Sequence, residues 1–510
     1  MERQSGVLMH ISSLPNGFST GGFGQECKDF VDLLVKGGFT LWQVLPFCLP
    51  DDFHSPYSSF SAFSGNPYFI SLTELRRMDL LTNAELAGAA EHVPYTCEFE
   101  RLAKERFSLL RRAALRVRDR APVENYLKDH PETEAFCRFM ALREANGKKP
   151  WNEWTIKDYD PELFFAWGFT QYEFDREWRE IKAYANERGI RIVGDIPIYV
   201  AYDSADVMGH PELFELDENG RPTSLAGCPP DYFSADGQFW GNPLYNWTRM
   251  KEDGFAWWEA RLRHMFDWFD CVRLDHFRGF SSYWSIPAGA ETAAEGKWRK
   301  GPGRAFVDML RRVADGRAVI AEDLGEATPD VPKLLAYSGL PGMRVFQFGF
   351  SGDPLSRDMP CFYVPNCVAY SGTHDNNTLL GYIWELDGSE RERMMAYLGC
   401  EGRPWDEAVR FAQRELYASV ADTVIFPMQD LLGFGADTRM NRPGEPDGNW
   451  AFRFTAQQLQ SLDTDRFARM AWLFGRRPAA VPTEAAETAS TQAETAKAAT
   501  APAAETAAKD

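Results

Sequence analysis

Short apolar runs alternate with amphipathic segments along most of this chain. An apolar run bounded by turn residues is typical of a buried strand, whereas apolar residues at helical spacing indicate a helix with one buried face. Runs of the first kind predict strands within the ranges 6–12, 39–46, 190–199, 269–279, 318–325, 343–350, 367–375 and 423–433.

Helical spacing of apolar residues occupies the intervals between these runs. Between the first two runs, apolar residues recur over 27–35 as on one helix face, and Gly37 and Gly38 follow where the helix would end. The same spacing predicts helices around 174–185, 258–269, 306–313, 331–335, 409–420 and 467–474. A strand, a helix and a further strand at this separation form a βαβ unit, so consecutive strands should be parallel.

Eight strands that alternate with helices predict an α/β fold of the closed (β/α)8 TIM-barrel type. An open, doubly wound sheet is the alternative. We disfavour it because no G-x-G-x-x-G or Walker-type loop follows any of the runs. The barrel should span 1–475.

Two long insertions interrupt the alternation. The segment 72–165 is helical and charged in pattern, which predicts a helical subdomain inserted after the second strand. The segment 201–247 combines aromatic and turn residues, which predicts either an exposed loop held for a ligand or an Ω-loop packed on itself. From residue 476 to 510 the chain is rich in Ala, Thr and Glu without large apolar residues, so we expect a disordered tail.

The charge of the chain argues against some classes of binding partner. The 510 residues include 55 basic and 74 acidic ones, and the net charge of −19 argues against nucleic acid or an anionic membrane as the main partner. Nine scattered cysteines without a C-x-x-C pair fit reduced thiols rather than a disulfide framework or a zinc site. With neither a signal-like N-terminus nor a long apolar run, the sequence predicts a soluble, cytoplasmic protein.

The stretch FDCVRLDHFRG at 269–279 carries the most concentrated chemistry. Its apolar start predicts a buried strand whose charged tip reaches a cleft. Arg273 and Asp275 lie two residues apart and so share one face of a strand. An arginine there can keep a nucleophilic carboxylate ionised. A structural ion pair at the end of a core strand is the alternative from this segment alone.

Three carboxylates follow three different predicted strands: Asp275, Glu322 and Asp375. The carboxyl ends of barrel strands converge on one mouth, where two carboxyl groups can carry out double displacement at an anomeric carbon. Asp275 would attack as an ionised nucleophile. Glu322 follows the apolar residues VIA, which would raise its pKa and suit a general acid/base. Asp375, beside His374, could hold sugar hydroxyls and favour the distorted ring.

A metal-dependent barrel hydrolase is a competing hypothesis. His276, His374, Asp375 and Glu322 are possible ligands. The chain has only eight histidines, and neither a His-x-His nor a His-Glu-x-x-His spacing occurs. We therefore expect no metal site.

Taken together, ten segments resemble the amylomaltases, which are 4-α-glucanotransferases of the α-amylase-like barrel clan. They run in family order from about Ser5 to Arg453: SGVLMHISSLP, LWQVLPF, SPYSSFSAFSGNPYFISL, GDIPIYVAYDSADV, GCPPDYFSADGQFWGNPLYNW, VRLDHFRGF, AEDLG, SGTHDNNT, FPMQDLLG and RMNRPG…GNW. The resemblance implies a cofactor-independent enzyme that cleaves α-1,4-glucan, holds the glycosyl group covalently and passes it to the 4-hydroxyl of another glucan. It also implies that the barrel lacks the separate C-terminal β-domain of the α-amylases.

By position, the resemblance implies Asp275 as nucleophile, Glu322 as general acid/base and Asp375 as transition-state stabiliser. It also implies a set of substrate-binding residues at the cleavage site, on the acceptor side and at the far rim: Tyr57, Asp195, Arg273, His374, Tyr232, Phe233, Trp240, Asn441 and Trp450. An amylase-like hydrolase and a catalytically silent glucan-binding protein remain the alternatives.

Overall fold

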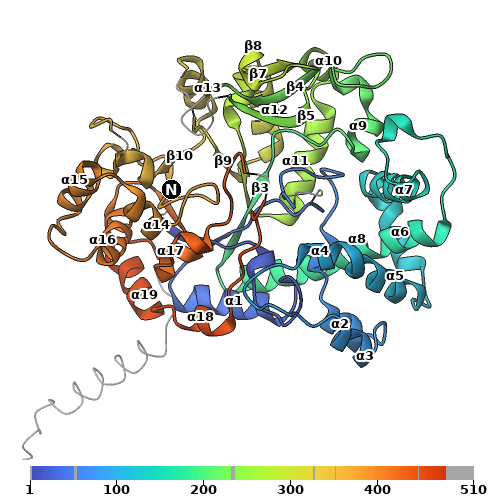
Figure 1. Cartoon of the computed structure of the whole chain (residues 1–510), viewed down its shortest axis with the longest axis horizontal. Helices are drawn as coiled ribbons and strands as arrows, with labels where there is room; N and C mark the ends of the chain where they lie inside the picture. The colour runs from blue at the N-terminus through green and yellow to red at the C-terminus, as the bar shows by residue number, and fades with distance from the viewer. Residues whose placement is uncertain are drawn as a thin grey trace, which may run out of the picture.

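A closed barrel of parallel strands forms the centre of the computed structural model, which describes residues 3–50, 54–230, 236–325, 328–350, 352–445 and 447–477 (Figure 1). Its strands follow the ring order β1-β12-β11-β10-β9-β6-β3-β2. Their bounds are β1 Gln4–Leu8, β2 Leu41–Gln43, β3 Arg191–Ile196, β6 Cys271–Leu274, β9 Ala318–Ala321, β10 Gly342–Val345, β11 Cys367–Tyr370 and β12 Thr423–Pro427. The predicted (β/α)8 barrel is confirmed, with one barrel strand in each of the eight predicted ranges.

The strands are shorter than the apolar runs that predicted them. The run 343–350 continues past β10 into a 3-10 turn at Phe346–Phe350, and the run 423–433 continues past β12 into the short helix α17 (Met428–Leu432). Apolar composition records burial, and the segments just beyond these strand ends are also mostly buried. Periodicity therefore located the strands but could not determine where each one ends.

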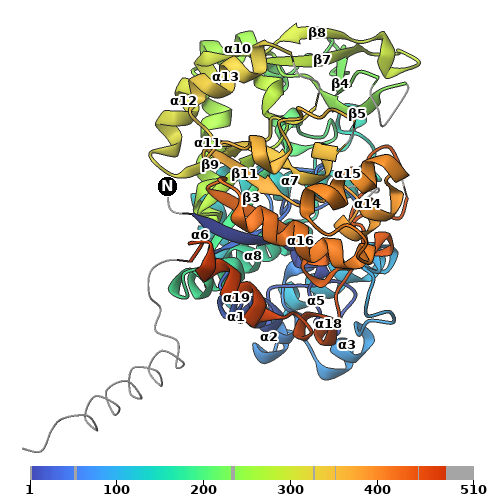
Figure 2. The same cartoon turned by 90° about the vertical axis from the view of Figure 1, so that its left-hand side faces the viewer.

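Helices surround the barrel and bury one face against it (Figures 1 and 2). Those predicted from the sequence are α1 (Gln25–Lys36), α8 (Pro161–Glu187), α11 (Ala256–Trp268), α12 (Arg304–Ala314), α13 (Asp330–Ser338), α16 (Trp405–Ala418) and α19 (Thr464–Leu473). The helix α8 is much longer than predicted and begins where Asp160 caps it, with Pro161 in its first turn. The short helices α14 (Leu379–Glu385) and α15 (Gly388–Leu398) were not predicted.

Between β2 and α8 the chain is mainly helical. It forms α2 (Leu72–Arg77), α3 (Asn83–Gly88), α4 (Phe99–Arg101), α5 (Phe107–Leu115), α6 (Ala121–Asp129) and α7 (Pro131–Ala145). The helices α5, α6 and α7 all pack on α8. None of the helices in the described part of the chain is both long and apolar enough to cross a membrane.

The sequence predicted a loop over the segment 201–247, but the described part of this segment also contains two strands. It contains β4 (Ser224–Cys228) and β5 (Gln238–Pro243), which join β7 (Ser282–Pro287) and β8 (Lys297–Lys300) in an antiparallel sheet of order β5-β4-β7-β8 (Figure 2). The pairing of β4 with β7 connects strands from two separate insertions. Local sequence carries no record of such a distant partner, so the sheet was missed. It follows the carboxyl ends of β3 and β6.

The barrel interior is filled by one face of each strand. Its apolar cluster includes Leu8, Leu41, Val193, Cys271, Ile320, Met343, Val368, Tyr370 and Ile425. Because side chains alternate along a strand, the residues two positions further on also point inward. This parity directs Asp195, Arg273 and Glu322 to the interior, on the carboxyl side of Val193, Cys271 and Ile320.

Arg476 belongs to the folded body, although the sequence placed it at the start of the tail. Its side chain is fully buried. Its guanidinium donates hydrogen bonds to the carbonyl oxygens of Tyr417 (2.9 Å), Ser419 (3.0 Å) and Gln4 (3.1 Å). Carbonyls at the end of a helix lack intrahelical partners, and a cation there is favourable. Arg476 thereby ties the end of α16 to β1. The rest of the predicted tail, from 478 on, lies outside the described residues.

We expect Arg476→Ala to lower the free energy of unfolding by about 2 kcal/mol, because buried carbonyls lose charged donors. The measurement is the midpoint of urea denaturation. Arg469→Ala, which removes an exposed arginine from α19, is the matched control and should change the free energy by less than about 0.5 kcal/mol. Equal midpoints for both variants would contradict the structural role of Arg476.

Candidate active site

The turn after β6 connects two of the three carboxylates. Asp275 directly follows the strand, and its backbone N–H donates to the carbonyl of Ile196 (3.0 Å). His276 adopts a left-handed conformation with φ of 48°. This directs its backbone N–H to the Oε2 of Glu322 at 2.7 Å, and the other oxygen of Glu322 accepts the N–H of Leu324 at 2.7 Å. The backbone thus holds Glu322 beside the Asp275 turn.

Arg273 lies between two carboxylates inside the barrel. Its Nη1 contacts both oxygens of Asp195 at 2.7 and 2.8 Å, and its Nη2 contacts Oδ1 of Asp275 at 3.0 Å. Asp195 is directly opposite Arg273 in the β3–β6 register. Burial opposes the charge of Arg273, but Asp195 and Asp275 outweigh it and raise the arginine pKa well above its ordinary value.

Asp275 and Glu322 differ in how readily each loses its proton. Burial raises the pKa of Asp275 to about 6, while the positive charge of Arg273 acts in the opposite direction. Burial also raises the pKa of Glu322 to about 7, with Arg273 lowering it and the negative charge of Asp275 raising it further. Arg273 was expected to keep Asp275 ionised; it limits the upward shift but does not overcome burial. Asp275 still ionises at a lower pH than Glu322.

Asp375 has the opposite electrostatic environment. Its Oδ2 lies 3.3 Å from Nε2 of His374, and its Oδ1 accepts a hydrogen bond from Asn441 at 2.6 Å. Burial alone would raise the pKa of Asp375, but His374 and Asn441 outweigh it and lower that pKa to about 2. In turn, burial disfavours the charged imidazole, but Asp375 outweighs it and raises the pKa of His374. Each of the two groups therefore favours the charged form of the other.

Arg439 is a site residue that the sequence reasoning missed. Its Nε donates to the carbonyl of Asn441 at 2.7 Å, and its Nη2 donates to the carbonyl of Asp375 at 2.6 Å. It therefore fixes the backbone positions of two residues whose side chains contact each other. The segment RMNRPG was singled out in the sequence, but its first arginine was not, because a contact with the Asp375 loop is not visible locally.

Aromatic rings form one wall of the site. The rings of Tyr57 and His374 stack with centroids 5.1 Å apart, and Trp450 lies 5.7 Å from each of them. The hydroxyl of Tyr57 donates to Asp195 at 2.8 Å. Asp195 therefore positions both Arg273 and Tyr57.

Trp240 reaches the site from β5. Its ring meets that of His276 edge to face at 4.9 Å and lies 6.2 Å from Tyr199. The sheet β5-β4-β7-β8 therefore places an aromatic side chain against the Asp275 turn. Tyr232 and Phe233, which the sequence also assigned to the acceptor side, lie outside the described residues.

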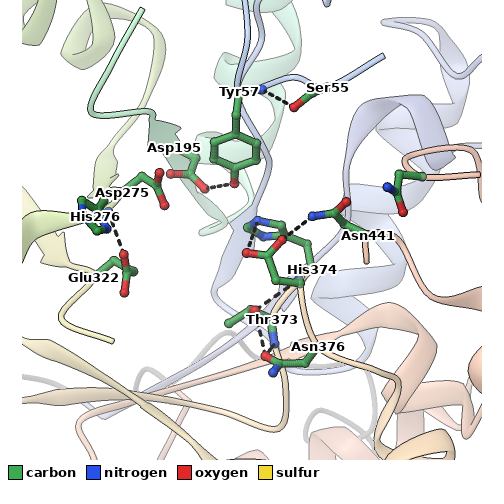
Figure 3. A network of polar contacts seen from close by, with 12 residues as sticks. Ser55, Tyr57, Asp195, Asp275, His276, Glu322, Thr373, His374, Asn376 and Asn441 are labelled. Carbon is green, nitrogen blue, oxygen red and sulfur yellow. Dashed lines mark hydrogen bonds and ion pairs between the residues drawn. The ribbon is translucent and has the colours of Figure 1, made fainter. Parts of the chain in front are cut away.

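The close-up view relates these groups in space. Figure 3 shows Asp275, His276 and Glu322 on one side, with Tyr57, His374 and Asn441 across from them. Apart from Tyr232 and Phe233, the structure brings the candidate residues of the sequence together at the carboxyl ends of the barrel strands. Two neighbouring carboxyl groups with different proton affinities can divide the roles of nucleophile and acid/base between them.

The described residues do not support the alternative of a metal-dependent hydrolase. Within them, no group of three or more His, Cys, Asp and Glu side chains is arranged to hold a metal ion. Three of the four candidate ligands already have polar partners: Glu322 accepts backbone N–H groups, and His374 and Asp375 contact each other.

Comparisons with known proteins show the family to which the chain is similar. A family model described as 4-alpha-glucanotransferase matches residues 9–459. The 4-alpha-glucanotransferase of Streptococcus pneumoniae is 43% identical over 90% of this chain and 94% of that protein. The 4-alpha-glucanotransferase of Thermus thermophilus is 40% identical over 92% of this chain and 98% of that protein.

Solved structures give the same result. The amylomaltase from Streptococcus agalactiae in complex with acarbose superposes with a TM-score of 0.89 at 36% identity, covering 93% of this chain and all of that one. The amylomaltase from Corynebacterium glutamicum, at 18% identity, shares the fold with a TM-score of 0.75 over 93% of this chain and 75% of that one. The chain belongs to the 4-alpha-glucanotransferase family.

Proposed function

We propose that this enzyme transfers α-1,4-glucan segments from a donor maltodextrin to the 4-hydroxyl of an acceptor glucan or glucose by retaining double displacement. The observation that carries the proposal is geometric: Asp275 directly follows β6, and the backbone N–H of the next residue, His276, holds the carboxyl group of Glu322. No cofactor enters the mechanism.

In the first half-reaction, ionised Asp275 attacks the anomeric carbon of the donor while Glu322 gives its proton to the leaving glycosidic oxygen. A covalent glycosyl group on Asp275 results. In the second half-reaction, Glu322 takes the proton of the acceptor 4-hydroxyl as that oxygen attacks the same carbon and releases Asp275. Arg273 orients the Asp275 carboxylate in both steps.

Asp375 stabilises the oxocarbenium-like transition state by holding the hydroxyls of the reacting sugar and favouring its distorted ring. Its partner His374 keeps it ionised, and Asn441 fixes its orientation. Tyr57 offers aromatic surface for the apolar face of a sugar ring, and the buried Trp450 packs against the rings of Tyr57 and His374. Asp195 accepts a hydrogen bond from the hydroxyl of Tyr57 and so fixes the position of its ring.

Transfer exceeds hydrolysis only if the covalent intermediate is protected from water while an acceptor binds. Trp240 lies against the Asp275 turn, where it can cover the intermediate and stack with an incoming sugar. Tyr232 and Phe233 belong to the same insertion and are proposed to complete the acceptor side. The donors and acceptors are α-1,4-glucans such as maltodextrins, amylose and glycogen-derived chains.

Incubation of the enzyme with maltotriose should produce glucose together with a series of longer maltodextrins, detected by chromatography. Asp275→Asn should reduce this activity by roughly a thousandfold or more, because the nucleophile is lost. Asp267→Asn, an exchange of the same type at an exposed position, is the control and should leave the rate unchanged.

The product pattern separates the alternatives. Shorter sugars alone, with a net gain of reducing ends, would indicate an amylase-like hydrolase. A lack of turnover in the unmodified protein would favour a silent glucan-binding protein. Unchanged turnover in Asp275→Asn would remove Asp275 as nucleophile.

The rate of transfer should depend on pH as a bell. Asp275 must be ionised, so activity falls below its pKa of about 6, and Glu322 must be protonated, so activity falls above its pKa of about 7. The measurement is kcat/KM for maltotriose against pH. With an α-maltosyl fluoride donor, whose leaving group needs no proton, the alkaline limb of glycosyl-enzyme formation should disappear in the unmodified enzyme, and Glu322→Gln should show the acid limb alone. An alkaline limb that persists in Glu322→Gln would contradict the assignment.

Arg439→Ala should lower kcat by roughly tenfold or more with a smaller change in KM, because Asp375 and Asn441 lose their backbone support and act mainly in the transition state. Arg439→Lys should recover part of the rate. Arg442→Ala removes a half-exposed arginine of the same segment and should have little effect. A change in KM alone, or equal effects of Arg439→Ala and Arg442→Ala, would argue against the positioning role.

A further inference from the structure

Two exposed tryptophans lie close together outside the active site. Trp384, on α14, is 64% exposed, and Trp405, at the start of α16, is 43% exposed. Their ring centroids are 6.2 Å apart, and the ring planes meet at 82°. A large apolar ring in water is unfavourable, and two at contact distance form a patch that suggests a ligand.

Arg391, from α15, holds this pair in place. Its guanidinium carbon lies 3.9 Å from the ring centroid of Trp405. The same guanidinium donates hydrogen bonds to the backbone carbonyls of Ile383 (3.1 Å) and Trp384 (3.2 Å) at the end of α14. One arginine thus links the helix that carries Trp384 to the ring of Trp405. Such preorganisation reduces the entropy lost when a ligand binds.

The pair is connected to the active site through α14. Thr378 caps this helix and lies three positions after Asp375 in the catalytic loop. At about 1.5 Å of rise per residue, Trp384 lies roughly 9 Å further along the helix than Thr378. The helices α14, α15 and α16 lie together on one side of the barrel (Figure 2). A polymer held at Trp384 would therefore remain close to the cleft.

We propose that Trp384 and Trp405 form a second binding site for an α-1,4-glucan chain, separate from the catalytic cleft. This inference rests on the proposed function for the identity of the ligand. The C–H faces of glucose stack on aromatic rings. At a centroid separation of 6.2 Å, the two indoles can each contact a different glucose unit of one chain.

The surroundings of the pair favour this ligand over other partners. Glu385 and Asp406, each adjacent in sequence to one of the indoles, are exposed and can accept hydrogen bonds from sugar hydroxyls. The ligand is uncharged, so the net charge of −19 does not repel it, whereas a polyanion would be repelled. The site would hold a long chain while one end of it reacts in the cleft.

Binding is measured by the retardation of the protein in native gels that contain amylose. The Asp275→Asn background prevents turnover of the polymer. In this background, Trp384→Ala and Trp405→Ala should weaken retention by about tenfold. Trp472→Ala, which removes a 71% exposed tryptophan on α19, is the matched control and should leave retention unchanged.

Activity on short and long substrates provides the second measurement. In the otherwise unmodified enzyme, Trp384→Ala should raise the apparent KM for amylose by roughly fivefold. It should leave the disproportionation of maltotriose unchanged, because a trisaccharide occupies the cleft alone. Trp384→Ala removes the more exposed ring and keeps Arg391 on Trp405, so this variant decides the question if Trp405→Ala is destabilised.

Three results would overturn the inference. If amylose retained Trp384→Ala and Trp405→Ala as strongly as Trp472→Ala, a glucan-binding site at these two tryptophans would be excluded. A parallel loss of maltotriose activity would assign Trp384 to the cleft instead. A shift from dimer to monomer in size-exclusion chromatography of Trp384→Ala, without a change in amylose retention, would make the patch an interface between copies of this chain.

The binding measurement does not depend on catalysis, so the two proposals can fail separately. Suppose that the unmodified protein shows no glycosyl transfer, while Trp384→Ala weakens amylose retention. The second binding site is then supported and the transferase mechanism is contradicted. If transfer occurs and retention is unaffected by Trp384→Ala, the reverse holds.

Discussion

The active site depends on one buried cation, the guanidinium of Arg273, shared between two carboxylates. A charge inside a barrel is tolerated only when it is paired and hydrogen-bonded. Arg273 meets this condition by contacting Asp195 on the neighbouring strand and Asp275 at the tip of its own strand. Asp195 in turn holds the hydroxyl of Tyr57, whose ring stacks on His374. The position of the aromatic wall therefore follows from the charge at the barrel centre.

The number of partners available to each carboxylate accounts for its proton affinity. Arg273 is divided between Asp195 and Asp275, so its attraction does not overcome the burial of Asp275, and the pKa of that group rises to about 6. Glu322 has a weaker share of the same cation and faces the negative charge of Asp275, so its pKa rises to about 7. Asp375 contacts His374 and accepts a hydrogen bond from Asn441, and these interactions lower its pKa to about 2. One site thus holds three carboxyl groups with different tendencies to carry a proton.

The elements around the barrel mouth add further side chains around this charged centre. The sheet β5-β4-β7-β8 places Trp240 against the Asp275 turn, and the segment after α17 supplies Arg439 and Asn441 to the Asp375 loop. The helix α14 begins directly after that loop and carries Trp384 outward. Each insertion follows a barrel strand, so a common scaffold presents several binding surfaces near one reaction centre.

The sequence by itself predicted the barrel, most of the helices that pack on it and the three candidate carboxylates, because these are recorded in local patterns. Apolar runs located the strands, and Asp275, Glu322 and Asp375 lie at the carboxyl ends of three of them in the sequence. Only the tertiary structure decided what depends on distant partners: the antiparallel sheet, the burial of Arg476, the contact of Arg439 with the Asp375 loop, and the pairing of Trp384 with Trp405. The same holds for the pKa of Asp275, since proton affinity depends on burial and on charges from several strands, which no single segment of sequence contains.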